Sequence, residues 1–219
     1  MKKVLLALVG SVLLLLGIYV LSLFYLAYLP PLGTVVQLQR YLEARSEDRS
    51  YVREYRYTPL AQASRHLPHA VVAAEDTRFF DHAGIDWVEL QGVIEASFER
   101  GRLGRGGSTI TQQLVKNLYL TTHRSALRKV VEMPMALIAE VILSKERILE
   151  LYLNVIEWGP GIFGMEAAAR YHYGKPASAL TRDEAARLAA CIPLPLERKP
   201  QTMNRYSQLI RGRMRVMGW

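Results

Sequence analysis

The sequence predicts a mainly α-helical protein, with one membrane-spanning helix followed by one helical domain. Three observations support this fold class. Residues 4–29 are apolar and uncharged, apolar residues recur at helical spacing through most of the remaining chain, and alternating strand patterns are scarce. A chain of 219 residues, half of them apolar, is long enough for one membrane segment and one domain with a substantial core. We expect a cytoplasmic N-terminus at 1–3, an anchor helix at 4–29, a juxtamembrane linker at 30–50 and the domain at 51–219.

The apolar run at 4–29 would span roughly 39 Å as a helix, more than the roughly 30 Å of a bilayer's hydrocarbon core. The alternative is a cleavable signal peptide, whose apolar core is usually only about 7 to 15 residues long. This run is longer and ends in bulky residues, which favours a retained anchor. Lys2 and Lys3 precede it, and no Lys or Arg follows before Arg40, so the sequence predicts a cytoplasmic N-terminus and an extracytoplasmic domain.

Charge and cysteine content exclude several classes of protein. The formal net charge is +8, which would draw a domain beside a bilayer to anionic headgroups or polyphosphates. Nucleic acid is disfavoured by the expected location and by the absence of a familiar binding motif. The segment GRLGRGGS resembles a phosphate-binding P-loop, but Gly107 stands where that motif needs lysine. Cys191 has no partner for a disulfide, and the sequence predicts no dedicated metal site.

Capping residues predict where the helices of the domain begin and end. Pro68 can open a helix, Gly101 can end one, and Pro134 is expected to kink the helix that contains it. The segment SKERILELYLN has the periodicity of a packing helix, so we assign Tyr152 and the leucines to the core. Three pairs have the spacing of a capping box: Asp86 with Glu89, Thr109 with Gln112, and Thr181 with Glu184.

The segment GGSTITQQLVKN carries polar residues on several faces of one expected helix. Gln112 and Lys116 are four residues apart, and Gln113 and Asn117 occupy the adjoining strip. A flexible loop followed by a solvated helix would explain the two glycines. It explains less well why amides and hydroxyls outnumber charges. We therefore expect a polar ligand to dock against this helix. The free amide groups at the N-terminus of the helix favour binding of an anion there.

Glu75 follows four small or apolar residues, near the expected C-terminus of a helix. The helix dipole disfavours negative charge there, so a desolvated Glu75 would have a raised pKa, which suits a general base or acid. The alternative is a solvated helix end, the commoner situation for an arbitrary Glu-Asp pair. Asp76 is interpreted as a local cap or hydrogen-bond organiser. Asp81 and His82 are given structural roles.

Basic residues surround a second glutamate farther along the chain. Arg124, Arg128 and Glu132 recur at four-residue spacing and so share one helix face, with Lys129 beside them. A stabilising ion pair alone would contribute at most about 0.2 to 0.5 kcal/mol. Arginine offers forked donors and lysine a point charge, so this group could hold a diphosphate.

The elements EDTRFFDHAG, GGSTITQQLVKN, RKVVE and KERILELYLN, in this order, resemble the peptidoglycan glycosyltransferase family in its single-domain form. The resemblance runs from about residue 71 to residue 200. It implies a lysozyme-like helical fold with two lobes, a cleft between them, and polymerisation of lipid II at the outer face of the bacterial cytoplasmic membrane. It also implies that lipid II and the growing glycan strand are the ligands, that other cell-wall synthesis or division proteins are partners, and that nucleic acid is not.

The same resemblance implies roles for individual residues. Glu75 resembles the general base that deprotonates the acceptor sugar's 4-hydroxyl. Glu132 resembles the second glutamate, which assists departure of the diphosphate directly or through a divalent cation, Mg²⁺ or Mn²⁺, with no obligatory cofactor. Because the transfer inverts the anomeric carbon, base and leaving-group stabiliser should face each other across the reacting centre. The expected substrate-binding residues are Thr109, Gln112, Gln113, Lys116, Asn117, Arg124, Arg128 and Lys129, of which Arg124 is the weakest match.

Some details depart from the family pattern. CIPLPLERKP replaces an expected Asn-Pro ending, which puts contacts near Pro193 and Pro195 in doubt, and Trp158 stands where a smaller aromatic is usual. No Ser is followed three residues later by Lys, so we expect no transpeptidase activity. Two alternatives stay open: a lytic transglycosylase or muramidase that shares the fold, and a non-catalytic scaffold that binds anionic lipid and recruits cell-wall enzymes.

Overall fold

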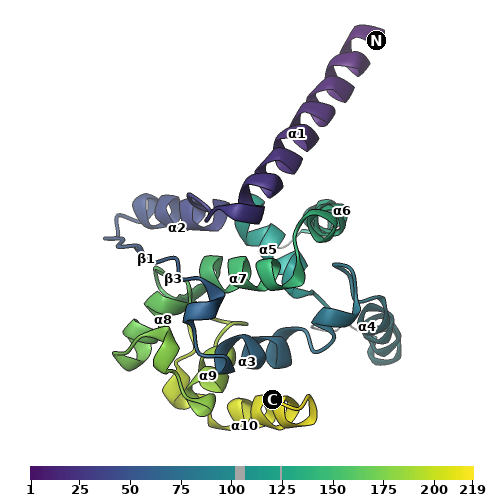
Figure 1. Cartoon of the computed structure of the whole chain (residues 1–219). Helices are drawn as coiled ribbons and strands as arrows, with labels where there is room; N and C mark the ends of the chain where they lie inside the picture. Colours follow the sequence, from purple (N-terminus) through teal and green to yellow (C-terminus); the bar gives the residue numbers. More distant parts are fainter. Residues whose placement is uncertain (102–106, 124) are drawn as a thin grey trace.

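The computed structural model describes residues 1–101, 107–123 and 125–219, and it confirms the mainly helical prediction (Figure 1). Three short strands form one small sheet in the order β1-β3-β2, with β1 (Glu54–Tyr55) parallel to β3 (Ile162–Phe163) and β2 (Glu157–Gly159) antiparallel to it. The helices of the described part are α1 (Lys2–Tyr28), α2 (Val35–Ser46), α3 (His66–Glu75), α4 (Trp87–Arg100), α5 (Ile110–Tyr119), α6 (Ala126–Ile142), α7 (Lys145–Val155), α8 (Met165–Tyr173), α9 (Arg182–Ala189) and α10 (Asn204–Val216).

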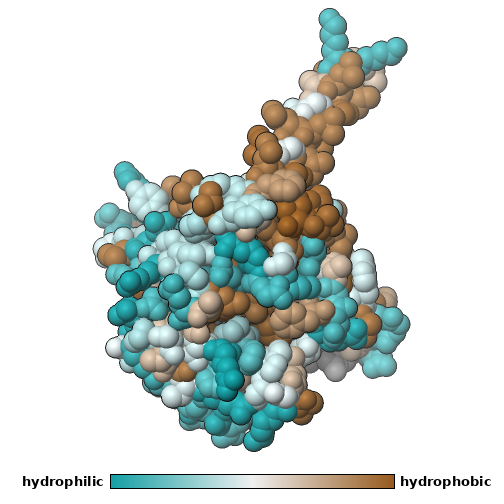
Figure 2. All heavy atoms as spheres, viewed as in Figure 1, coloured by the Kyte–Doolittle hydropathy of each residue, from teal (hydrophilic) through white to brown (hydrophobic). Residues whose placement is uncertain are grey.

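Helix α1 projects away from the rest of the molecule (Figure 1). Its 27 residues are long and apolar enough to cross a membrane. Its last turns belong to the domain, because Tyr19, Leu23 and Leu26 are buried, and the Tyr19 hydroxyl donates to the Met135 carbonyl of α6 at 2.6 Å. Figure 2 shows that the apolar surface of α1 continues onto the body where the helix joins it.

The stretch expected to be a linker, 30–50, contains helix α2, which the sequence analysis missed. Thr34 caps its N-terminus by accepting from the Gln37 amide. Arg40 of α2 donates at 2.8 Å to Glu157, which is buried in β2. Only Val36, Gln37 and Ala44 of α2 are buried, so the helix lacks the wide apolar stripe that periodicity detects.

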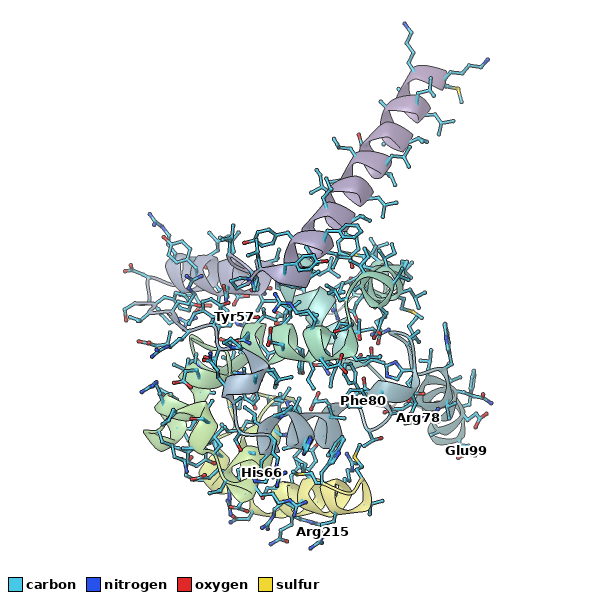
Figure 3. The ribbon with its side chains drawn as sticks, viewed as in Figure 1. Tyr57, His66, Arg78, Phe80, Glu99 and Arg215 are labelled. Atoms are coloured by element: carbon cyan, nitrogen blue, oxygen red, sulfur yellow. The ribbon has the colours of Figure 1, made fainter. Side chains whose placement is uncertain are left out.

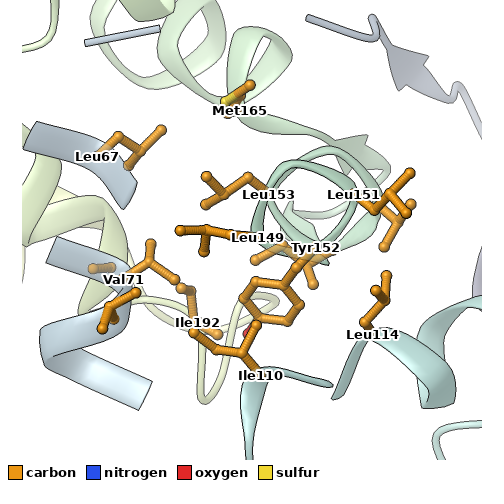
Figure 4. Close-up of a cluster of buried hydrophobic side chains, with 14 of the residues drawn as sticks. Leu67, Val71, Ile110, Leu114, Leu149, Leu151, Tyr152, Leu153, Met165 and Ile192 are labelled. Atoms are coloured by element: carbon orange, nitrogen blue, oxygen red, sulfur yellow. The ribbon is translucent and has the colours of Figure 1, made fainter. Parts of the chain in front are cut away.

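Helix α7 lies at the centre of the core, as the periodicity of SKERILELYLN predicts. Its middle is buried on all sides, because α5 and α8 pack against it. Figure 4 shows the Tyr152 ring among side chains of α5 and α7, including Ile110 and Leu149. Helix α3 packs on α9 and α10 at the other side of this core. Asn154, whose role the sequence left undecided, is fully buried, and its amide binds both backbone groups of Thr58.

The capping predictions hold at most helix ends. Thr109 with Gln112 and Thr181 with Glu184 form complete capping boxes, and Asp86 accepts from the amides of Val88 and Glu89. Gly101 ends α4 in the left-handed conformation at φ 62°.

Two details near prolines and glycines refine the sequence analysis. Pro68 does not open α3, which begins two residues earlier at His66; the first turn tolerates it because amides there need no intrahelical acceptor. The segment EWGPGIFG contains strands β2 and β3 and the turn that connects them. Gly161 is required in it, since its φ is 74° and a Cβ would lie 2.5 Å from the Val52 carbonyl oxygen. Trp158 is fully buried and fills the core beside this turn.

Candidate active site

Glu75 is the last residue of α3, as expected, and lies half-buried in the domain. Its Oε2 accepts a hydrogen bond of 2.9 Å from Nε2 of Gln113 on α5. Burial raises the pKa of Glu75, and the Gln113 hydrogen bond with the charges of Lys116 and Arg198 opposes that rise. A carboxylate whose pKa is raised but which still has a donor partner suits proton abstraction near neutral pH.

Gln113 is held in one orientation by Tyr152. The Tyr152 hydroxyl donates to Oε1 of Gln113 at 2.9 Å, so the amide's nitrogen faces Glu75. Burial raises the pKa of the Tyr152 phenol well above the usual value, so the hydroxyl keeps the proton that it donates here. The sequence placed Tyr152 in the core and missed this second role, since periodicity reports the ring and not the hydroxyl.

Asp76 joins the end of α3 to the start of α5. Its Oδ2 accepts at 2.9 Å from the Ile110 amide, the first of α5, and its Oδ1 lies 3.0 Å from Nε2 of His82. The carboxylate is 2% exposed, so both hydrogen bonds are shielded from water. These contacts fit the interpretation of Asp76 as an organiser, and they set Glu75 opposite Gln113.

Glu132 of α6 lies among cations, as the spacing of RKVVE predicts. It is 2% exposed, and its oxygens accept from Arg128 at 2.6 Å and from Lys129 at 2.7 Å. The Lys129 ammonium also donates to Ser108 Oγ at 3.0 Å and to Gln112 Oε1 at 3.1 Å. Two cations around one buried carboxylate leave positive charge to spare, which suits a bound polyphosphate.

Lys116 of α5 has an ammonium group whose pKa depends on both glutamates. Burial lowers the pKa of its ammonium, while the charges of Glu132 and Glu75 both oppose that effect. Both carboxylates therefore lie within electrostatic reach of one ammonium group. The expectation that Glu75 and Glu132 belong to one site agrees with this arrangement.

The structure separates the other predicted site residues into two groups. Thr109, Gln112 and Asn117, which were expected to bind substrate, are instead buried and bonded within the protein. Thr109 donates to the Gly84 carbonyl at 2.6 Å, and Asn117 donates to the Gln113 carbonyl at 2.8 Å. Gln113 and Lys116 stay partly exposed. Arg124 lies outside the residues that the structure describes.

Two residues near Glu75 escaped the sequence analysis. Arg198 lowers the pKa of Glu75 through its charge, and its guanidinium donates to the Ala190 carbonyl at 2.8 Å. Arg213 of α10 donates to the Ala73 carbonyl at 3.0 Å, close to the end of α3. Arg198 lies in the CIPLPLERKP segment, whose departure from the family pattern was the only sequence signal for it.

Glu132 is a poor ligand for a resident metal ion, because each of its oxygens accepts from a cation. Among the described residues, the group that brings three candidate ligand atoms within 4.8 Å of one another is Asp76, His82 and Asp86. Its Asp76 already serves the α5 amide and His82.

Fold and site together define a class: a helical enzyme with a long apolar N-terminal helix, a carboxylate whose pKa is raised by burial, and a second carboxylate set among cations. Within this class, the chain belongs to the transglycosylase family, whose model matches residues 42–217.

Individual relatives agree with this membership. A biosynthetic peptidoglycan transglycosylase of Nitrosospira multiformis is 42% identical over 194 residues, which cover 87% of this chain and 84% of the relative. Proteins with the same description from Azoarcus sp. and Brucella suis are 49% and 40% identical, over 79% and 92% of this chain and 77% and 88% of their own lengths.

Proposed function

We propose that this peptidoglycan glycosyltransferase polymerises lipid II into linear β-1,4 glycan strands at the outer face of the bacterial cytoplasmic membrane, and releases undecaprenyl diphosphate. The observation that carries the proposal is the way neighbouring residues of α5 contact both acidic sites: Gln113 donates to Glu75, and Gln112 accepts from the Lys129 ammonium that pairs with Glu132. A base and a leaving-group stabiliser held by neighbouring residues of one helix can act on the two sides of a single reacting centre. The biosynthetic relatives favour this function over the lytic alternative.

In the proposed reaction, Glu75 removes the proton from the acceptor sugar's 4-hydroxyl as that oxygen bonds to the donor's anomeric carbon. The bond between that carbon and the diphosphate oxygen breaks, and the carbon's configuration inverts. Negative charge develops on the leaving diphosphate, where the Arg128 and Lys129 cations around Glu132 stabilise it. The diphosphate already carries the activation, so no nucleotide is consumed.

The anchor supports a site beside the bilayer. The 27 residues of α1 would extend about 40 Å, more than the roughly 30 Å of hydrocarbon, so its last turns reach the membrane boundary. Those turns contain Tyr19 and Leu26, which pack into the domain. Helix α6, which contacts α1 and carries Glu132, exposes Leu127, Val130 and other apolar side chains. A lipid-linked substrate would meet the site at this depth. The two N-terminal lysines favour a cytoplasmic N-terminus.

Arg128 and Lys129 also support a reaction without an obligatory metal. They supply two positive charges at the place where a divalent cation would otherwise neutralise the diphosphate. Mg²⁺ or Mn²⁺ that arrives with the diphosphate would reach Glu132 only by displacing one of them.

The test is lipid II polymerisation by Glu75→Gln, compared with wild type and with Glu146→Gln, an exposed glutamate of α7. Loss of a general base reduces rates by about 10² to 10⁴-fold, so we expect that loss for Glu75→Gln and near wild-type rates for the control. Full activity of Glu75→Gln would overturn the assignment. Release of fragments from purified sacculi, without polymerisation, would instead identify a lytic enzyme. Retention of partner binding with no activity on either substrate would identify a scaffold.

A further inference from the structure

A hollow lined by arginines lies at the end of the molecule opposite the anchor. Arg182 of α9 and Gln208, Arg211 and Arg215 of α10 line it, and its volume is about 410 Å³. The three lining residues of α10 share one face of that helix, because they are three and four positions apart. In Figure 3, Arg215 lies below α10 at the far end from α1. The hollow is thus separate from the site around Glu75 and Glu132.

Positive charge in the hollow exceeds negative charge. Arg211 pairs with Asp183 at 3.1 Å, but the same carboxylate also accepts from Arg187 at 2.6 Å. Within the described ranges, neither Arg182 nor Arg215 forms an ion pair. One carboxylate shared by two arginines therefore leaves at least two guanidinium charges uncompensated in the hollow.

Two buried donors of the lining arginines lack an acceptor. The Nε atoms of Arg182 and Arg211 are buried and find no hydrogen-bond partner among the residues that the structure describes. Buried donors in proteins are nearly always paired, because an unpaired one loses its hydration without compensation. Guanidinium groups with free donors are suited to carboxylate or phosphate oxygens, which can accept two of their hydrogen bonds at once. The hollow therefore has the chemistry of an anion site.

The positive field extends from the hollow onto α3. Burial lowers the pKa of His66, and the charges of Arg65 and Arg182 lower it further. Burial also lowers the pKa of His69, and the charges of His66 and of the same two arginines lower it further. These histidines are then neutral at pH 7, so the permanent charges of the arginines define the surface. An anion site built on arginine keeps its charge at any physiological pH.

Position decides between the two common sources of such anions. Lipid phosphates lie at the anchor's end of the molecule, whereas α10 is at the opposite end (Figure 1). The polymer that this family makes carries peptides with free carboxylates, and that polymer lies beyond the bilayer. We propose that the hollow lined by Arg182, Gln208, Arg211 and Arg215 binds peptide carboxylates of peptidoglycan and so holds the membrane-distal end of the enzyme against the wall.

Co-sedimentation with purified sacculi tests this binding without any catalysis. The full chain in detergent micelles would be pelleted with sacculi at about 0.1 M salt, where charges separated by more than about 10 Å are screened. We expect sacculi to retain at least about fivefold less of the triple variant Arg182→Gln/Arg211→Gln/Arg215→Gln than of the wild-type protein. The matched control, Arg56→Gln/Lys199→Gln/Arg205→Gln, removes the same charge from exposed positions that do not line the hollow. Equal losses in both triple variants would overturn the proposal, because diffuse charge would then explain the binding.

Blocking the carboxylates identifies the ligand. Amidated sacculi should bind the wild-type protein as weakly as untreated sacculi bind the arginine variant. If amidation leaves the binding of wild-type protein unchanged, carboxylate recognition would be overturned. The arginine variant could also lose binding to anionic vesicles as strongly as it loses binding to sacculi. That result would show a general polyanion site and would also overturn the proposal.

Two further measurements separate this site from the catalytic one and from misfolding. Glu75→Gln should bind sacculi like wild type, and the arginine variant should polymerise lipid II in detergent at the wild-type rate. If the triple variant melts early, the exposed Arg215→Gln alone should still lower retention about twofold. Wild-type retention by a folded Arg215→Gln variant would contradict the proposal.

Discussion

The amide nitrogen of Gln113 lies 2.9 Å from the Glu75 carboxylate and donates a hydrogen bond to it. That bond stabilises the charged carboxylate, whereas burial destabilises it, so the pKa of Glu75 depends on the balance between the two. The orientation of one amide is therefore part of the acid–base chemistry, and Tyr152 controls that orientation.

Tyr152→Phe should weaken the base without touching it. The Gln113 oxygen would lose its donor, so the amide would be held less firmly with its nitrogen toward Glu75, which weakens the stabilising hydrogen bond. The pKa of Glu75 would then rise further, so the deprotonated base would form only at higher pH. We expect about tenfold lower activity at neutral pH and an acid limb of the kcat/KM profile displaced to higher pH.

The profile separates this effect from general damage to the core. A variant that is merely destabilised would have a lower maximal kcat/KM, while the acid limb of its profile would stay at the same pH. That result would contradict the role given to Tyr152. Leu153→Met, a volume-conserving change in the same buried helix, is the matched control and should leave both amplitude and limb unchanged.

Lys116→Met should lower activity and raise stability together. Burial lowers the pKa of Lys116 in the folded protein despite both glutamates, so its protonated form disfavours folding. An apolar side chain of similar length removes that penalty, and we expect a gain of about 1 kcal/mol at pH 7. Activity should fall by at least about 100-fold, because a cation whose charge acts on both glutamates is lost.

The pH dependence of unfolding checks the sign of this prediction. The folded-state pKa lies below the unfolded-state pKa, so the gain is complete below the folded value and disappears as pH rises toward the unfolded value. Denaturation of both proteins across pH 7 to 11 would show whether their stabilities converge. A loss of stability at pH 7 would mean that the ammonium's attraction to Glu75 and Glu132 exceeds its desolvation.

How far the sequence could predict this site depends on which way each side chain points. Glu75 and the Arg128–Glu132 pair were predictable, because a helix end and a four-residue spacing are local properties. Thr109 and Asn117 were expected to contact substrate, but both are bonded inside the protein. The Thr109 partner, Gly84, lies 25 residues away in the chain, and spacing within α5 contains no information about it.

The same limit applies to α2 and to Arg198. Few side chains of α2 are buried, so its helical signal was weak and the stretch was expected to be a linker. Arg198 acts on Glu75 through the folded arrangement of segments that are distant in sequence. Local patterns predicted the elements and the surroundings of Glu75 and Glu132, whereas the partners of these glutamates from distant segments required the tertiary structure.

Cations of the protein should matter more than added metal. Replacing Arg128 and Lys129 together by methionine should reduce lipid II polymerisation at least about 100-fold, because the leaving diphosphate loses both charges. A chelator such as EDTA should reduce the wild-type rate by less than about tenfold. Complete loss of activity with EDTA, restored by Mg²⁺ or Mn²⁺, would show instead that a metal is obligatory.

Arg147 should couple the anchor to the catalytic domain. Its guanidinium donates at 2.7 Å to the carbonyl of Leu26 and at 2.7 Å to that of Leu29, at the end of α1 where free carbonyls favour a cation. The same group also binds Tyr57 and Glu150, and the side chains of Arg147 and Glu150 are each only 16% exposed. Five residues farther along α7, Tyr152 holds Gln113 against Glu75.

Removing this guanidinium leaves the partly buried Glu150 carboxylate without its cation, although Tyr57 and the Leu60 amide still donate to it, and it takes the donor from two carbonyls of α1. Arg147→Gln should therefore lower the free energy of unfolding by about 3 kcal/mol, read as an earlier thermal transition in detergent. Arg147→Lys keeps the charge beside Glu150, but its single ammonium group cannot donate to both carbonyls as the guanidinium does. Its thermal transition should therefore lie between those of wild type and Arg147→Gln. Protease cleavage between α1 and α2, around residues 29–34, should accelerate in the same order. An unchanged cleavage rate in Arg147→Gln would show that the buried tyrosine and leucines of α1 hold the anchor without this contact.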